Sequence, residues 1–170
     1  MIRLSGVSRD SIVDGPGLRT TIFVQGCPHH CPGCHNPQTW PFEGGTETDP
    51  QALFEMIQSD PLCHGVTLSG GEPFAQAEAL IPLVRSLKDA GYEVAAYSGY
   101  TFEQLMGGTP GQRALLSLID VLIDGPFILA QRSLELNYRG SRNQRVLNVP
   151  ESLKQGKAVP EMSPRWLGEY

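Results

Sequence analysis

The sequence has no apolar run close to the about 20 residues that a helix needs to cross a bilayer. Its most apolar stretch, residues 114–123, is interrupted by Ser117 and Asp120. The amino-terminal residues also lack the apolar segment of a secretory signal. Basic residues are too few to create a positive field, because 13 Lys and Arg face 18 Asp and Glu, a net charge of −5. These absences argue against membranes and nucleic acids as partners, and we expect a cytoplasmic location.

Cysteine is scarce, but three of the four cysteines lie close together. Cys27, Cys31 and Cys34 have the spacing C-x₃-C-x₂-C, whereas Cys63 stands apart and is the only candidate for a fourth cysteine partner. Because the cytosol is reducing, clustered cysteines there more often bind metals or take part in catalysis than form disulfides. The spacing therefore predicts a metal or catalytic site between Gly26 and Pro37.

The chain length and composition predict one globular domain, because 40% of the residues are hydrophobic and 18% are charged. Apolar, β-branched runs alternate with amphipathic stretches, which is typical of a parallel sheet covered by helices. We expect strands at 20–26, 65–73, 92–100 and 119–127, a weaker one at 144–149, and helices at 50–58, 75–91 and 109–120. A complete eight-stranded barrel takes about 250 residues, so the shorter chain favours an open, partial parallel β/α barrel of about four to six strands.

The end of the chain differs from this pattern. Pro150, Pro160 and Pro164 fall in a segment without an apolar period. We therefore expect residues 1–149 to form the domain and residues 150–170 to form a loosely ordered extension.

Two kinds of metal site are compatible with the three clustered cysteines. A structural zinc ion normally takes four nitrogen or sulfur ligands, and the fourth could come from one of His29, His30, His35 or Cys63. An iron–sulfur cube is bound by thiolates, and three of them would leave one iron open for another ligand. The compact loop, its position after a predicted core strand and its Pro and Gly residues favour the iron–sulfur site.

The C-x₃-C-x₂-C loop resembles that of the radical S-adenosylmethionine (SAM) enzymes. The resemblance implies a 4Fe–4S cluster with Cys27, Cys31 and Cys34 as ligands, and SAM bound to the open iron. It also implies that the partial β/α barrel is of the radical SAM type.

A second motif, "GGEP" at Gly70, Gly71, Glu72 and Pro73, ends the next predicted strand. Two glycines let a ligand approach the backbone closely, and a glutamate can accept a hydrogen bond from an ammonium group. The motif alone is a common turn. After a loop of the radical SAM type, it resembles the segment that holds the amino group of SAM.

The next two strand ends, "YSGYT" and "DGPF", also read as ordinary turns when taken singly. The resemblance implies that they line the cofactor cleft, with Ser98 and Asp124 as polar contacts. Related enzymes often carry Lys or Arg two residues after this aspartate, near the SAM carboxylate. This chain has Pro126 there, so the motif does not identify the residue that binds the carboxylate.

Arg139, Arg142 and Arg145 form a local group of basic residues in an acidic chain. They are either a solvated face or a site that binds a carboxylate or a partner protein, since Arg pairs with carboxylates through two hydrogen bonds. Of the three, Arg139 is our candidate for a cofactor-binding residue.

Three longer segments indicate a subgroup of the radical SAM enzymes. They are "VDGPGLRTTIFVQGC", "CHNPQTW" and "YRGSRNQR". Over residues 11–145 the chain resembles the glycyl radical enzyme activases, and the last motif and the short chain are most similar to the activating proteins of anaerobic ribonucleoside-triphosphate reductase. The resemblance implies an oxidoreductase that cleaves SAM reductively and makes a glycyl radical on the large reductase subunit. It also implies a flavodoxin-like electron donor.

Other functions stay open at this point. Within the same chemistry, the chain could activate another glycyl radical enzyme, of the pyruvate formate-lyase type, or act as a 7-carboxy-7-deazaguanine synthase. From a different class, it could be a ferredoxin-like electron carrier or a zinc-binding module.

Overall fold

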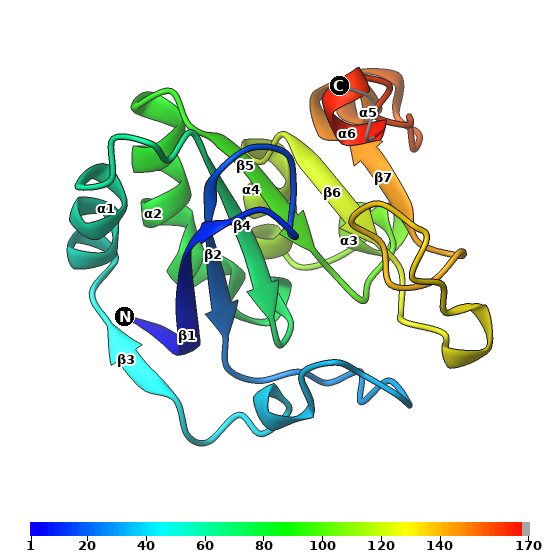
Figure 1. The fold of residues 1–170 in the computed structure, drawn as a ribbon, viewed down its shortest axis with the longest axis horizontal. Coiled ribbons are helices and arrows are strands. Elements are labelled where there is room, and N and C mark those ends of the chain that lie inside the picture. Colours follow the sequence, from blue (N-terminus) through cyan, green and yellow to red (C-terminus); the bar gives the residue numbers. More distant parts are fainter. Residues whose placement is uncertain (168–170) are drawn as a thin grey trace.

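The computed structural model describes residues 1–167 and shows one open, mixed sheet (Figure 1). Within these residues the sheet has seven strands in the order β3-β1-β2-β4-β5-β6-β7. The four central strands, β2, β4, β5 and β6, are parallel, and the outer pairings are antiparallel. The bounds are β1 Ile2–Ser11, β2 Arg19–Val24, β3 Thr46–Thr48, β4 Gly65–Gly70, β5 Glu93–Tyr97, β6 Val121–Asp124 and β7 Arg145–Asn148.

Four helices, α1, α3, α4 and α5, begin at a side-chain cap. The carboxylate of Asp49 accepts from the amide of Gln51, and Thr101 and Thr109 form capping boxes with Gln104 and Gln112. The helices are α1 Pro50–Gln58, α2 Ala77–Asp89, α3 Phe102–Met106, α4 Pro110–Leu118, α5 Val149–Gln155 and α6 Pro164–Leu167. Short 3₁₀ turns are η1 Pro37–Thr39, η2 Pro73–Gln76 and η3 Leu129–Gln131. No helix in this described part is long and apolar enough to span a membrane.

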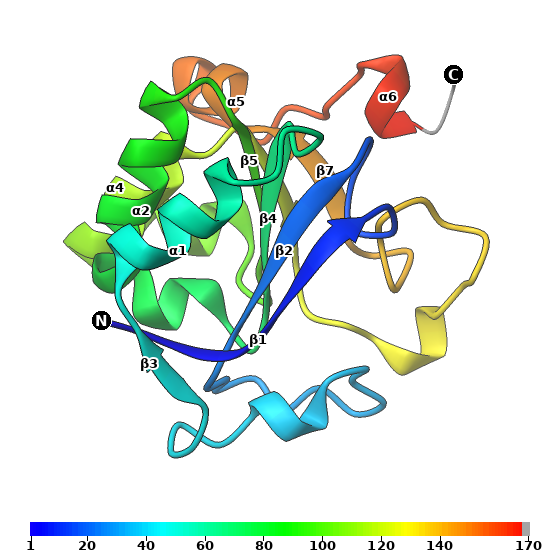
Figure 2. The same cartoon turned by 60° about the vertical axis from the view of Figure 1, so that its left-hand side comes forward.

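The helices and the long loops lie on opposite sides of the sheet. Figure 2 shows α1, α2 and α4 on one side, and the β6–β7 connection and α6 on the other. Leu68, Val94 and Leu122 belong to the main core on the helical side, while Ala95 and Ile123 belong to a smaller cluster that contains Trp166. The sheet is therefore buried on both faces, as expected for apolar parallel strands.

Four predicted strands, β2, β4, β5 and β6, are parallel as expected, whereas the weaker fifth one, β7, is antiparallel, and the predicted strand number is wrong. We expected about four to six strands, and the structure adds β1 and β3 at one edge. β1 carries polar and charged residues along most of its length, and its pairing with β2 shifts register twice, so it lacks a regular apolar alternation. The sheet is open in this structure, and the expectation of a barrel is not confirmed.

The expected loose extension from residue 150 differs from the structure. The side chain of Asn148 caps α5, and Gly156 ends it in the left-handed conformation. Leu147 bridges to Pro160, and Trp166 in α6 is 2% exposed. Pro150 and Pro164 occupy first helical turns, where they need no amide hydrogen, so they did not prevent order. Residues 168–170 of the expected extension lie outside the described residues.

Candidate functional site

A cavity of about 570 Å³ lies at the carboxyl ends of the parallel strands. This is where ligands bind in parallel α/β sheets. The cysteine loop, the glycine pair after β4 and the ends of β5 and β6 contribute the side chains and backbone Cys27, Cys31, Cys34, Gly70, Gly71, Tyr97, Ser98 and Gly125. The structure thus brings together most of the residues that the sequence singled out.

The cysteine loop is held by backbone hydrogen bonds at its two ends. The amide of Gly26 donates to the carbonyl of Thr39 at 2.7 Å, and the amide of Cys27 donates to Trp40 at 3.0 Å. Inside the loop, the amide of Cys34 donates to the carbonyl of Cys31 at 3.0 Å. These bonds return the chain to the end of β2, so that all three thiols face one cavity.

The thiols are free, and their surroundings suit a metal-containing group. Cys27 is buried, and burial raises the pKa of its thiol because the thiolate is poorly solvated there. A bound metal supplies the positive charge that a thiolate needs in such a place. Three thiols on one cavity are the soft donors that iron–sulfur groups take, so the residues fit that group.

A single metal ion is a poorer match to the same residues. Among the described residues, no three His, Cys, Asp or Glu side chains converge on a point where they could hold one ion. Cys63 does not line the cavity: its thiol is buried and donates to the carbonyl of Gly65 at 3.2 Å. Of the histidines, His30 stacks on Trp40 and His29 lies against Glu72.

Glu72 is fully buried, and its carboxylate is surrounded by protein donors. Oε1 lies 2.6 Å from Nε2 of His29 and accepts from the amide of Gly99 at 2.8 Å. The hydroxyl of Ser98 donates to both oxygens, and the amide of Phe74 donates to Oε2 at 3.0 Å. The carboxylate therefore joins three loops, and these donors leave little room for it to accept from a ligand ammonium group.

The two glycines of the "GGEP" motif are required by the close approach of two backbones. Gly70 has a φ of +90°, and a Cβ there would lie 2.6 Å from the amide nitrogen of Val24. A Cβ on Gly71 would lie 2.3 Å from the carbonyl oxygen of Gly26. Because both glycines also line the cavity, their bare backbone faces the place where a ligand would bind. Pro73, by contrast, is buried at the start of η2.

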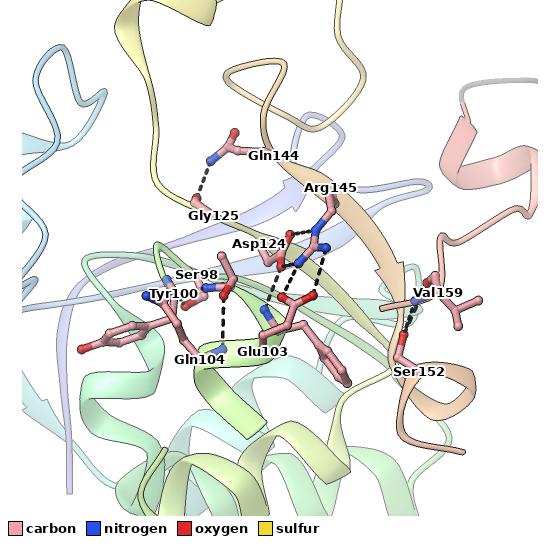
Figure 3. Close-up of polar contacts among 12 residues, drawn as sticks. Ser98, Tyr100, Glu103, Gln104, Asp124, Gly125, Gln144, Arg145, Ser152 and Val159 are labelled. Carbon is pink, nitrogen blue, oxygen red and sulfur yellow. Dashed lines mark hydrogen bonds and ion pairs between the residues drawn. The ribbon is translucent and has the colours of Figure 1, made fainter. Parts of the chain in front are cut away.

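Asp124 does not line the cavity, although the sequence singled it out. It is 1% exposed, and its carboxylate accepts from the amide of Phe102 at 2.8 Å. Arg145 donates to it twice, from Nε at 3.0 Å and from Nη2 at 2.5 Å, and also pairs with Glu103 (Figure 3). These ion pairs raise the pKa of Arg145 and lower that of Glu103. Asp124 therefore links β6 to β7 and α3.

The predicted basic residues do not form one group in the structure, because Arg139 and Arg145 have different surroundings. Arg139 lines the cavity, with Nη1 donating to the carbonyl of Gln144 at 3.2 Å, whereas Arg145 is used by Asp124 and Glu103. Arg19, the first residue of β2, is buried and pairs with Glu93. Of the three predicted arginines, Arg139 alone lines the cavity, where Arg132 is a second lining arginine.

The motif "YRGSRNQR" has a role that the sequence did not reveal. Oε1 of Gln144 accepts from the amides of Gly140 and Ser141, and its Nε2 donates to the carbonyl of Gly125 (Figure 3). Asn143 donates to the carbonyl of Pro126 at 2.8 Å. The motif therefore fastens the β6–β7 connection to the end of β6 and shapes one wall of the cavity.

Tyr97 is a wall residue within the strand end that was expected to line the cleft, although the sequence analysis did not single it out. It is the last residue of β5, lines the cavity and donates from its hydroxyl to the carbonyl of Tyr138 at 2.6 Å. Burial raises the pKa of Tyr97 well above its ordinary value. Its position directly before Ser98, a predicted site residue, was the sequence signal that could have identified it.

Comparison with known proteins places this site in context. Residues 13–147 match a family profile described as a 4Fe-4S single cluster domain. The chain is 38% identical over 141 residues to the anaerobic ribonucleoside-triphosphate reductase-activating protein of Vibrio cholerae, covering 78% of this chain and 89% of that protein. The protein of the same name from Escherichia coli K12 is 34% identical over 141 residues, covering 78% and 90%.

Two more distant similarities were found. The pyruvate formate-lyase-activating enzyme of Clostridium pasteurianum is 36% identical over 118 residues, covering 64% of this chain and 50% of that enzyme. Among solved structures, QueE from Escherichia coli matches with a TM-score of 0.42 and 21% identity, over 59% of this chain and 51% of that one.

Proposed function

The chain belongs to the family of the anaerobic ribonucleoside-triphosphate reductase-activating proteins, and on this premise we propose that it makes the glycyl radical of such a reductase. It is a radical SAM enzyme of the activase type, which cleaves SAM reductively at a 4Fe–4S cluster. The observation that carries the proposal is the convergence of three free thiols and the bare glycine pair on one cavity.

Cys27, Cys31 and Cys34 are the proposed ligands of the cluster. When bound, the cluster and SAM supply the one-electron chemistry that ends in a radical on a glycine of the reductase. The chain's own task is to hold the loop in place, and the bonds from Gly26 and Cys27 to η1 and Trp40 do this. The open sheet is proposed to be the partial barrel that the family resemblance implies.

The remaining site residues are proposed to bind SAM either directly or by positioning others. The backbone of Gly70 and Gly71 faces the cavity and offers polar groups to the SAM amino group. Arg139 is the proposed partner of the SAM carboxylate, in place of a basic residue at Pro126. Glu72, Pro73, Ser98 and Asp124 support these groups through the hydrogen bonds and packing described above.

The mouth of the cavity suits a large substrate. Val13 and Leu134 lie among the lining residues and are 71% and 90% exposed, so apolar side chains stand at the rim. A loop of another protein could cover them, whereas a small substrate would leave them in water. The reductase glycine is the proposed target, and the flavodoxin-like donor and the cytoplasmic location stay predictions from the sequence.

An anaerobic assay tests the function. The chain is reconstituted with iron and sulfide, which should yield about four of each per chain for the cluster. It is then incubated with SAM, a reductant and the large reductase subunit, and a glycine-centred doublet should appear by electron paramagnetic resonance. One zinc per chain and no doublet would contradict the proposal. A doublet on pyruvate formate-lyase instead would favour the second candidate, which rests on the similarity to the Clostridium enzyme.

A further inference from the structure

The indole nitrogen of Trp40 is buried and has no hydrogen-bond acceptor among the described residues. Trp40 lines the same cavity as the three cysteines of the loop. A buried donor without an acceptor is destabilising, and native proteins rarely keep one without a reason. This donor therefore has no acceptor among the described residues.

The position of the Trp40 ring is fixed by the loop itself. The ring stacks on His30 with centroids 4.7 Å apart and an interplanar angle of 7°, so the histidine covers its face and leaves its edge for hydrogen bonding. The backbone of Trp40 donates to Pro37 at 3.2 Å and accepts from Cys27 at 3.0 Å. The indole is thus held next to a proposed cluster ligand by short, local contacts.

The backbone carbonyls next to Trp40 in the sequence already accept other hydrogen bonds. The carbonyl of Thr39 accepts from Gly26, and Gln25 donates to the carbonyls of Gln38 and Pro41. Cysteine thiolates and inorganic sulfides are acceptors, and hydrogen bonds to these sulfurs are a common feature of iron–sulfur sites. The three thiols on the same cavity make such a sulfur the natural acceptor.

We propose that the indole N–H of Trp40 donates a hydrogen bond to a sulfur atom of the iron–sulfur group held by the cysteine loop. Trp40 is then a positioning residue that also tunes the group. The inference rests on the proposed function, because it requires the cluster to be present. A donor at a sulfur stabilises the reduced state, which carries one more negative charge, and so raises the reduction potential.

The first test is the midpoint potential of the reconstituted protein, followed by electron paramagnetic resonance. Trp40→Phe keeps a flat, smaller ring against His30 and removes the N–H donor. The loss of one hydrogen bond should disfavour reduction about fivefold. For a one-electron couple, this fivefold change is a fall of ~40 mV. Trp166→Phe is the matched control, because Trp166 lies outside the cysteine loop and donates to Glu93 at 3.4 Å. The midpoint potential of the Trp166→Phe protein should equal that of the unmodified chain.

The second test needs no change at Trp40. The chain has two tryptophans, so a Trp166→Phe protein labelled with ¹⁵N-tryptophan carries the label at Trp40 alone. Pulsed paramagnetic resonance of the reduced protein should show a ¹⁵N coupling. If Trp40→Phe fails to take up iron, the ¹⁵N coupling alone tests whether the indole donates to a sulfur of the cluster.

An unchanged potential in Trp40→Phe, or a reduced signal without ¹⁵N coupling, would overturn the inference and assign the donor to a water molecule. A failure of the proposed function looks different. In that case the unmodified chain takes up no four-iron group, so neither a midpoint potential nor a ¹⁵N coupling can be measured.

Discussion

At the residue scale, Glu72 holds three parts of the site together. Its carboxylate receives donors from the cysteine loop through His29, from the end of β5 through Ser98 and Gly99, and from η2 through Phe74. Because it is fully buried, each donor that loses this acceptor is left without water to replace it. Glu72 supports the site because both oxygens of its carboxylate accept hydrogen bonds from these donors.

Glu72→Gln should therefore destabilise the chain by about 2 kcal/mol or more, because a side-chain NH₂ group replaces an oxygen that accepts hydrogen bonds. The measurement is urea unfolding of the metal-free protein. Glu47→Gln is the control: Glu47 pairs with Arg3 but is 59% exposed, so its change should stay below about 1 kcal/mol. Equal unfolding midpoints for the two variants would contradict the role of Glu72.

The cysteines allow a separate prediction. Alanine at Cys27, Cys31 or Cys34 should abolish uptake of the four-iron group and cleavage of SAM. Cys63→Ala should retain both, because Cys63 contacts Thr20 and Gly65 within the core. Iron analysis and SAM cleavage after anaerobic reconstitution measure this. A Cys63 variant that loses the cluster, with a Cys27 variant that keeps it, would show that the ligand assignment is wrong.

Residue spacing predicted part of this site, and long-range pairing supplied the rest. The thiols and the glycine pair follow from local sequence, since each lies in one short segment at a strand end. The partner of Glu72 could not be read in this way, because His29 lies 43 positions earlier in the chain. The pairing of Arg145 with Asp124 is also long-range, and it removed one arginine from the predicted basic group.

At the element scale, Arg145 connects three elements at the far edge of the parallel strands. It begins β7, pairs with Asp124 at the end of β6 and reaches Glu103 in α3. The partly exposed guanidinium thus neutralises a carboxylate that is 1% exposed. The β6–β7 pairing positions the loop that forms one wall of the cavity.

Arg145→Ala should destabilise the chain by about 3 kcal/mol, because it leaves the buried Asp124 carboxylate without a counter-charge. The value is at the low end for a buried pair, since the Arg145 side chain is 39% exposed. Thermal and urea unfolding of the metal-free protein measure the change. A loss below 1 kcal/mol would mean that the amide of Phe102 alone satisfies Asp124.

Glu103→Gln is the matched variant on the exposed side of the same arginine. Glu103 is 59% exposed, so its loss should cost less than about 1 kcal/mol. Arg145 lowers the pKa of Glu103, so the ion pair adds stability above the ordinary glutamate pKa and loses it as the pH falls through the lowered pKa. The unfolding free energies of Glu103→Gln and the unmodified chain should therefore converge with acidification. A constant difference would contradict the ion pair.

The strands show which elements a pattern can predict. β4, β5 and β6 are apolar and central, so their runs stand out from the neighbouring sequence. β3 is an edge strand and β1 lies between it and β2, and the exposed, polar residues of both strands are held by these pairings. That pairing depends on tertiary context and leaves little periodic signal.

At the scale of the whole molecule, Trp166 connects the carboxyl-terminal helix to distant parts of the fold. Its ring lies 5.4 Å from the guanidinium carbon of Arg19 and 5.2 Å from the ring of Tyr138. Its indole nitrogen donates to Glu93 at 3.4 Å. Tyr138 lines the cavity, so the end of the chain supports the wall of the site from outside.

The proline-rich composition concealed this arrangement. Composition reports the average character of a segment, whereas the order of the segment depends on one buried aromatic residue and two helix caps. A single tryptophan in α6 has no periodic neighbours, and its contacts come from β2, β5 and the β6–β7 connection. The sequence could therefore predict the parallel centre of the fold and not the packing of its last segment.

Trp166→Ala should lower the unfolding free energy by about 3 kcal/mol, because a buried aromatic side chain leaves a cavity. It should also loosen residues 128–140, where a protease should cut faster than in the unmodified chain. Trp166→Phe is the control: it keeps an aromatic ring for Arg19 and Tyr138, so cutting should stay near the original rate. The measurement is limited proteolysis with mass spectrometry beside thermal unfolding. A Trp166→Ala chain that unfolds at a lower temperature but is cut at the original positions and rate would show that α6 does not support the cavity wall.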